Sequence, residues 1–121
     1  MPTYHGSCHC GTVRFEVDTE LTEFTSCNCS LCRKRNAVMA GVHEDHFRLL
    51  EGQDNLGLYQ WNTKVAKHYF CKTCGIYPFH KRRSAPETYA VNVFCLDDAE
   101  VDRVPVVTAD GRSMSVVGAT G

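Results

Sequence analysis

The chain has 121 residues, of which 43% are hydrophobic and 22% charged, and its net charge at pH 7 is −1. This length suits a single domain over residues 1–121, and the balanced charge gives no sign of a nucleic-acid or membrane-surface partner. No stretch approaches the roughly 20 apolar residues of a membrane span, and the polar first dozen residues show no signal peptide. We therefore expect a cytoplasmic protein, whose oligomeric state the sequence does not indicate.

Short alternating runs of apolar and polar residues predict strands. Residues 12–18 alternate cleanly, which is typical of a half-buried strand. Ser30–Arg35 is the predicted helix, with Ser30 as its N-cap. Further strands are expected at 47–50, 56–61, 66–70, 76–80 and 89–94.

Many short strands with little helix indicate a mainly β protein of antiparallel sheets with one short helix. Turn residues separate the expected strands, so neighbouring strands can pair as hairpins. The small, polar tail over residues 108–121 is expected to be loosely held.

Cysteine is the residue type that stands out, with eight copies. In a reducing compartment, clustered cysteines indicate metal ligands or redox groups. Seven of them fall into three clusters and one stands alone. The eight are Cys8, Cys10, Cys27, Cys29, Cys32, Cys71, Cys74 and Cys95.

The cluster at residues 71–75, Cys-x-x-Cys-Gly, has the spacing of half a zinc site. Two intervening residues let the chain turn so that both sulfurs face one ion, and the glycine relieves the tight backbone. A redox dithiol can use the same spacing.

The first cluster, Cys8 and Cys10, requires a bend, because a regular strand would send the two side chains to opposite faces. Gly11 makes such a bend easy. The first and third clusters together indicate a closed tetrahedral site of four thiolates. Spacing also permits Cys71 and Cys74 to share an ion with two cysteines of the middle cluster.

The middle cluster contains Cys27, Cys29 and Cys32. Three thiolates do not complete a tetrahedron, so a zinc ion held by them would keep one position open, as catalytic zinc sites do. Two alternatives remain. Cys95 or a histidine could close a second structural site, or the three cysteines could be a metal-free thiol cluster.

Other candidate residues lie close to these clusters. Arg33 follows the middle cluster directly and is a candidate for binding a carboxylate. His68 and His80 flank the third cluster on expected strands and are expected to be packed or surface residues. Cys95 is expected to be a buried free thiol.

The three clusters in their order resemble the glutathione-dependent formaldehyde-activating family, which includes centromere protein V. The motifs are Cys-x-Cys-Gly at 8–11, Cys-x-Cys-x-x-Cys-Arg at 27–33 and Cys-x-x-Cys-Gly at 71–75. The run Tyr-Ala-Val-Asn-Val-Phe-Cys-Leu at 89–96 is also similar to a family segment.

The resemblance implies a β-tent fold, in which antiparallel sheets surround zinc. It implies a structural zinc and a catalytic zinc. The structural zinc would be held by Cys8, Cys10, Cys71 and Cys74, and the catalytic zinc by Cys27, Cys29 and Cys32.

The family reaction joins formaldehyde to the thiol of glutathione and gives S-(hydroxymethyl)glutathione; its reverse cleaves a carbon–sulfur bond. We therefore expect a zinc-dependent carbon–sulfur lyase whose small-molecule partner is glutathione or a glutathione-like adduct. Zinc in the open site would lower the pKa of the incoming thiol, and the thiolate would attack the carbonyl carbon. Arg33 would bind a carboxylate of that thiol.

Two other classes of function fit the same residues. One is a non-catalytic zinc scaffold that binds a protein partner and needs no open coordination position. The other is a redox switch in which Cys27, Cys29 and Cys32 form a disulfide on mild oxidation and release zinc.

Overall fold

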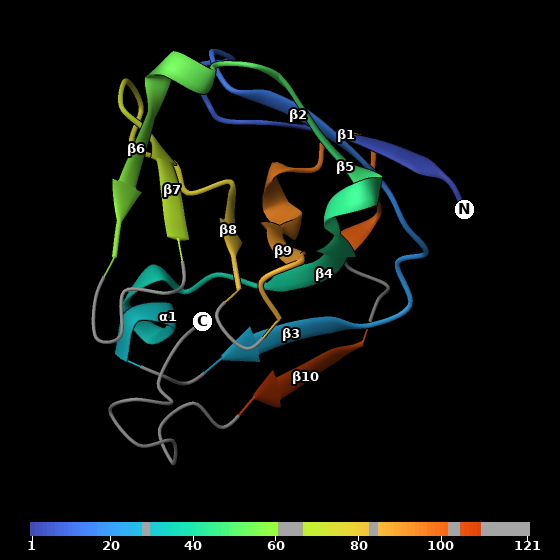
Figure 1. Ribbon diagram of the computed structural model, residues 1–121. Coiled ribbons are helices and arrows are strands. Elements are labelled where there is room, and N and C mark those ends of the chain that lie inside the picture. Colours follow the sequence, from blue (N-terminus) through green and yellow to red (C-terminus); the bar gives the residue numbers. More distant parts are fainter. Residues whose placement is uncertain (28–29, 61–66, 83–84, 102–104, 110–121) are drawn as a thin grey trace.

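The computed structural model describes residues 1–27, 30–60, 67–82, 85–101 and 105–109 (Figure 1). The description does not extend to the side chains of Cys27, Ser30, Cys32 and Ala109. Among the described residues, no helix is both long and apolar enough to cross a membrane.

Within these residues the chain forms short strands, one α-helix and three short 3-10 helices. The strands are β1 (Thr3–Ser7), β2 (Arg14–Asp18), β3 (Phe24–Cys27), β4 (Met39–His43), β5 (Phe47–Glu51), β6 (Leu56–Tyr59), β7 (Lys67–Cys71), β8 (Phe79–Lys81), β9 (Thr88–Asn92) and β10 (Val106–Ala109). The helices are α1 (Ser30–Arg35), η1 (Glu44–His46), η2 (Gln53–Asn55) and η3 (Val93–Cys95).

The strands form two sheets. The smaller sheet has the order β1-β2-β5, and the larger has the order β10-β3-β4-β9-β8-β7-β6. In the view of Figure 1 the small sheet lies across the top, and α1 lies below β6 and β7. All strand pairs are antiparallel except β10 with β3, which is parallel. The predicted mainly β fold of antiparallel sheets with one short helix is confirmed.

Four predicted strands are shorter than expected. Segment 12–18 is a strand only from Arg14, and segment 56–61 only to Tyr59. The segment 89–94 is a strand only to Asn92, because the Asn92 side chain accepts a hydrogen bond from the Phe94 N–H and starts η3. The segment 76–80 joins the sheet at Phe79. The predicted loose tail begins inside β10, whose end pairs with β3, and residues 110–121 lie outside the described part.

Aromatic rings from both sheets form the centre of the core. Phe15 of β2 lies edge-on to Phe79 of β8, with ring centroids 5.4 Å apart. Phe47 of β5 stacks on Tyr89 of β9 at 4.1 Å. Because aromatic side chains bury large apolar areas, these contacts hold the two sheets together.

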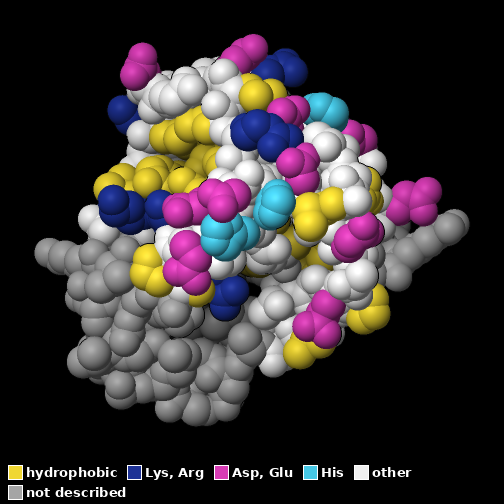
Figure 2. Space-filling model, turned by 45° about the vertical axis from the view of Figure 1, so that its right-hand side comes forward, with side chains coloured by type: hydrophobic (Ala, Val, Ile, Leu, Met, Phe, Trp, Pro, Cys, Tyr) yellow, Lys and Arg dark blue, Asp and Glu magenta, His cyan; other side chains and the backbone are white. Residues whose placement is uncertain are grey.

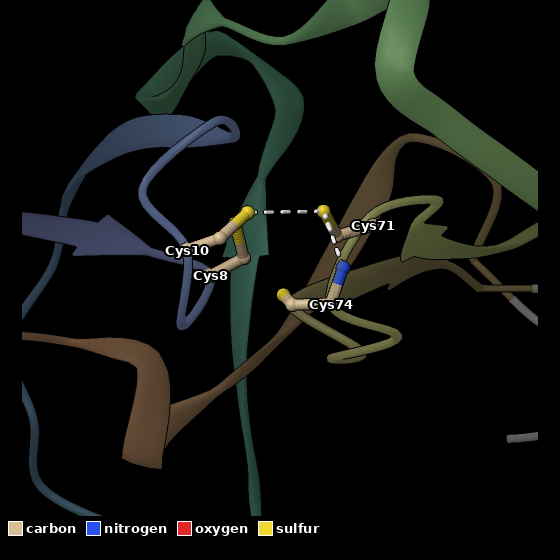
Figure 3. A group of neighbouring side chains, drawn as sticks. All are labelled: Cys8, Cys10, Cys71 and Cys74. Carbon is tan, nitrogen blue, oxygen red and sulfur yellow. Dashed lines mark hydrogen bonds between the residues drawn. The ribbon is translucent and has the colours of Figure 1, made fainter.

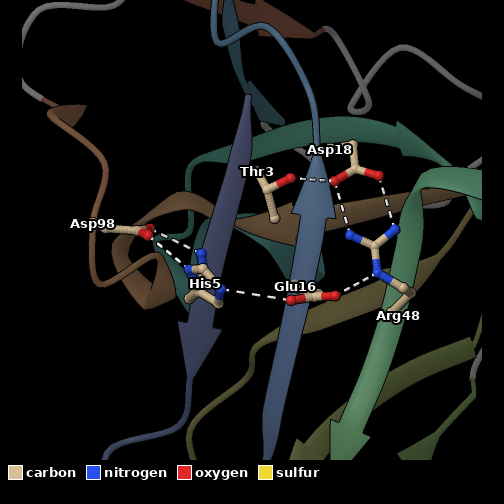
Figure 4. A network of polar contacts seen from close by, with 6 residues as sticks. All are labelled: Thr3, His5, Glu16, Asp18, Arg48 and Asp98. Carbon is tan, nitrogen blue, oxygen red and sulfur yellow. Dashed lines mark hydrogen bonds and ion pairs between the residues drawn. The ribbon is translucent and has the colours of Figure 1, made fainter. Parts of the chain in front are cut away.

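The outer face of the small sheet carries a polar network (Figure 4). Arg48 of β5 donates to both carboxylate oxygens of Asp18, each at 2.8 Å, and to Glu16 at 2.5 Å. His5 of β1 lies between Glu16 and Asp98, which follows η3. On the face drawn in Figure 2, basic, acidic and histidine side chains are interspersed over the described part. The network therefore joins β1, β2, β5 and the segment after η3 by paired charges.

The segment that follows α1 is anchored on the larger sheet. Ala37 and Met39 are buried and pack with Ala90 of β9 and with Tyr77. Arg35, the last residue of α1, places its guanidinium carbon 3.8 Å from the centroid of the Tyr77 ring. These contacts fix the C-terminal end of the helix against the sheet.

Candidate metal centre

Four cysteine sulfurs meet in one place (Figure 3). The Sγ atoms of Cys8, Cys10, Cys71 and Cys74 all lie within 4.8 Å of one another. Cys8 and Cys10 are separated by 3.6 Å, and Cys10 and Cys71 by 3.7 Å. A tetrahedral zinc site with Zn–S bonds of about 2.3 Å has sulfur–sulfur edges of about 3.8 Å. The four sulfurs therefore fit one tetrahedrally bound metal ion.

Two similar turns bring these sulfurs together. The backbone N–H of Gly11 donates to the Cys8 carbonyl at 3.2 Å, and that of Gly75 donates to the Cys71 carbonyl at 2.8 Å. Both glycines have positive φ, 81° and 78° respectively, a conformation that is strained for other residues. The predicted bend at Gly11 is confirmed.

Hydrogen-bond donors point at the sulfurs of Cys8 and Cys71. The backbone N–H of Val13 lies 3.3 Å from Cys8 Sγ, and that of Cys74 lies 3.5 Å from Cys71 Sγ. The Asn55 side-chain amide donates to Cys71 Sγ at 3.4 Å. Such donors stabilise the negative charge of thiolates and orient them as ligands.

The thiols of the four-cysteine cluster differ in acidity. Burial raises the pKa of Cys8 to about 11. At Cys74 burial also acts to raise the pKa, but hydrogen bonds, chiefly with the backbone of Cys10 and Ile76, outweigh it and lower the pKa to about 6. A bound cation would displace the remaining protons, so metal affinity at this cluster depends on pH.

Cys95 lies apart from the four-sulfur group. It is buried in η3, and its Sγ lies 3.9 Å from the Tyr77 carbonyl oxygen. Burial raises the pKa of this thiol to about 12. Cys95 is thus the buried free thiol that the sequence predicts.

The middle cluster lies largely outside the described residues. The backbone of Cys27 ends β3 and that of Cys32 lies in α1, but Cys29 and the side chains of Cys27 and Cys32 are not described. Arg33 lies in α1 with an exposed side chain. The open zinc site of this cluster and the carboxylate-binding role of Arg33 stay predictions.

His68 and His80 are packed residues, one of the two outcomes that the sequence predicted, but the polar cluster that they form beside α1 was not predicted. His68 of β7 and His80 of β8 are opposite each other, fully or almost fully buried, with ring centroids 4.7 Å apart. Arg35 Nη1 lies 2.9 Å from His68 Nδ1, and the Tyr77 hydroxyl is hydrogen-bonded to His80 Nδ1. The sequence contained a signal for this pairing. His68 and His80 are the same number of residues from Cys74, so a hairpin that turns at Cys74 places them opposite each other.

Comparisons with known proteins agree with this architecture. The family model described as "Glutathione-dependent formaldehyde-activating enzyme" matches residues 3–109. A crystal structure of a Rhodobacter sphaeroides protein is 44% identical, with a TM-score of 0.78, over 85% of this chain and 99% of that chain. An uncharacterised lyase of Schizosaccharomyces pombe is 26% identical over 83% of this chain and 73% of its own length.

A Halomonas elongata protein that is named as a glutathione-dependent formaldehyde-activating enzyme is 33% identical. The match covers 57% of this chain and only half of the Halomonas protein. Parts of that relative therefore have no counterpart in the aligned region.

Proposed function

Because the chain belongs to the glutathione-dependent formaldehyde-activating enzyme family, we propose that it is a zinc-dependent carbon–sulfur lyase of the cytoplasm. Its substrate would be a glutathione-like thiol adduct, as for S-(hydroxymethyl)glutathione synthase. The observation that carries the proposal is the family match over residues 3–109, which includes all three cysteine clusters in one domain. The name of the fission-yeast relative, a lyase, supports the reaction class.

The proposal assigns two zinc ions. The structural ion is assigned to Cys8, Cys10, Cys71 and Cys74, supported by their sulfur–sulfur distances. The catalytic ion is assigned to Cys27, Cys29 and Cys32; of these, the backbone of Cys27 ends β3 and that of Cys32 lies in α1. Bound there, zinc would act as a Lewis acid that lowers the pKa of an incoming thiol.

Helix α1 supplies cationic groups for an anionic substrate. Its last turn carries Arg33, Lys34 and Arg35. Arg35 is engaged with Tyr77, whereas the side chain of Arg33 is exposed. A guanidinium binds a carboxylate through two parallel hydrogen bonds, which a lysine ammonium cannot do. Arg33 is therefore the residue that would hold a glutathione carboxylate.

The reaction itself is an addition to a carbonyl. The thiolate sulfur attacks the carbon of formaldehyde and forms the carbon–sulfur bond. The carbonyl electron pair moves to oxygen, which takes up a proton and becomes the hydroxyl of S-(hydroxymethyl)glutathione. The reverse steps release thiolate and aldehyde, so protein groups that stabilise charge on this oxygen accelerate both directions.

The test is the exchange rate between formaldehyde and S-(hydroxymethyl)glutathione, measured by NMR in the presence of the zinc-loaded protein. We expect the wild type to accelerate the exchange, and Cys29→Ser to lose at least about 100-fold because a zinc ligand is missing. Cys95→Ala, which removes a thiol outside the proposed sites, is the matched control and should keep the rate.

Two results would contradict the proposal. One is a wild-type protein that leaves the exchange at its uncatalysed rate. The other is a Cys29→Ser protein that keeps both its second zinc ion and full activity. Zinc binding without turnover would favour the scaffold alternative.

A further inference from the structure

The contact between Arg35 and His68 fixes the position of a proton. A guanidinium only donates hydrogen bonds, so His68 Nδ1, 2.9 Å from Arg35 Nη1, must be the acceptor. Burial and the Arg35 charge lower the pKa of His68 to about 4, so the ring is neutral at pH 7. A neutral imidazole that accepts at Nδ1 carries its hydrogen on Nε2.

This Nε2–H is buried without an acceptor. The His68 side chain has no exposed surface, and its Nε2 makes no hydrogen bond within the described residues. A buried donor without a partner loses its hydration and gains nothing in return. Proteins pair nearly all such groups with protein atoms, ordered water or a ligand, so this donor needs a partner that the described chain does not supply.

The surroundings keep the His68 ring in this orientation. Arg35 is itself held over the Tyr77 ring by a cation–π contact. The ring of His80 also lies against His68, with ring centroids 4.7 Å apart, and is hydrogen-bonded to Tyr77. The ring therefore cannot turn over without breaking the contact with Arg35.

The His68 Nε2–H donor is connected, through the hydrogen bond between Arg35 and His68, to helix α1, which carries candidate catalytic residues. Arg35 follows Cys32 by about one helical turn in α1, and Arg33 belongs to the same turn. The tautomer of His68 is thus fixed by Arg35 of α1, the same helix that carries the candidate site residues Cys32 and Arg33. A group held in advance in this way stabilises developing charge without reorganisation during the reaction.

We propose that His68 Nε2–H binds the oxygen of the carbonyl or hydroxymethyl group of the substrate, and that Arg35 is the positioning residue that keeps the donor tautomer. This assignment rests on the proposed lyase function. As the carbon–sulfur bond forms, the carbonyl electron pair moves to oxygen, and the Nε2–H hydrogen bond stabilises the new negative charge. The proton that completes the hydroxyl comes from solvent and replaces the one that the thiol released.

The same geometry argues that His68 is not the residue that closes the middle zinc site. Binding a metal through Nε2 would require the hydrogen to move to Nδ1, where it would face the donating Arg35. We therefore expect that His68→Leu leaves the zinc content of the protein unchanged.

The first test uses the wild-type, zinc-loaded protein labelled with ¹⁵N-histidine, in which two-bond ¹H–¹⁵N spectra distinguish the tautomers. We expect His68 to be in the Nε2–H form at pH 7. Adding glutathione with formaldehyde should shift the Nε2 signal, whereas glutathione alone should not. The exposed His43 serves as an internal reference that neither addition shifts.

The second test separates catalysis from structure. His68→Leu should lower kcat of the exchange reaction about 100-fold and leave KM for glutathione within about twofold, as expected for a donor that acts on the transition state. His68→Gln keeps an amide N–H near the Nε2 position and should recover part of the rate. Arg35→Met, which no longer fixes the tautomer, should lower kcat and add the Nδ1–H form to the spectra.

The outcomes distinguish this inference from the lyase proposal. Two results would overturn the role of His68 but not the lyase proposal. One is an active wild type in which the adduct does not shift the His68 Nε2 signal. The other is a His68→Leu protein with the wild-type exchange rate. A wild type without turnover whose Nε2 signal still moves with the adduct overturns the reaction but supports the oxygen-binding site. A wild type with neither response overturns both. If His68→Leu does not fold, the spectra of the wild type still decide.

Discussion

Strand β1 is attached to the rest of the molecule in two different ways. Just after its C-terminal end, Cys8 and Cys10 place their sulfurs against those of Cys71, the last residue of β7, and Cys74. At the middle of β1, His5 meets Asp98 through its backbone N–H at 2.8 Å and its ring at 2.9 Å. The first attachment is a part-buried group of four sulfurs that fits a metal ion, whereas the second is an exposed ionic network.

The difference teaches how much each attachment contributes to stability. Exposed ion pairs are screened by water and salt and add little. A structural zinc contributes about 10–16 kcal/mol of binding free energy in zinc-finger peptides, and this is folding free energy when the site exists only in the folded chain. We therefore expect the metal to hold the N-terminal strand and the polar network to align it.

The largest expected effect comes from breaking the four-sulfur site. Cys10→Ser removes one ligand, so the ion is lost together with most of the stability, which for a domain is about 5–15 kcal/mol. Thermal unfolding with parallel metal analysis measures this. Cys95→Ala is the control and should keep the four-sulfur ion. Similar unfolding temperatures for Cys10→Ser and the wild type would contradict a structural metal here.

A smaller effect is expected from the group that donates to a sulfur. Asn55→Ala removes the amide N–H on Cys71 Sγ and should lower metal affinity about 10–100-fold while the fold persists. Competition with a chromogenic chelator measures the affinity. Gln53→Ala, at a neighbouring residue whose side chain donates to the Leu49 carbonyl, is the matched control. Equal affinities for the two variants would show that the sulfur contact is inert.

The smallest effect is expected in the exposed network, and it depends on pH. The hydrogen bond with Asp98 raises the pKa of His5 above its ordinary value. The contribution of protonated His5 is therefore fully present below about pH 6.5 and is lost as pH rises through the raised pKa. His5→Gln should lower Tm by a few degrees at most at pH 5.5 and hardly at all near pH 9. A difference that grows with pH would reverse this assignment.

Sequence patterns recovered the strands that show apolar alternation or a clear hairpin. The segments that became β2, β5, β6 and β7 were predicted within a few residues, and α1 was predicted with the bounds that the structure gives. The strands β1, β3, β4 and β10 were not predicted. Strand β4, for example, reads Met-Ala-Gly-Val-His, without the period of two that marks a half-buried strand. Pairing with neighbours, which no local pattern contains, makes them strands.

The candidate site likewise has features that could be predicted from local sequence and features that could not. The turns around Cys8 and Cys71 were predictable, because ligand spacing and the following glycines are local properties of the chain. The contact of Arg35 with His68 was not, since it joins a helix end to a strand distant in sequence. Whether a histidine is a buried neutral donor depends on neighbours that only the folded chain supplies.

The most direct test of the two-zinc account is the zinc content per chain, determined by elemental analysis on protein purified under reducing conditions without added metal. We predict about two zinc ions in the wild type and about one in Cys29→Ser, since the four-sulfur site is intact there. One ion in both proteins would contradict the open middle site and with it the proposed lyase mechanism.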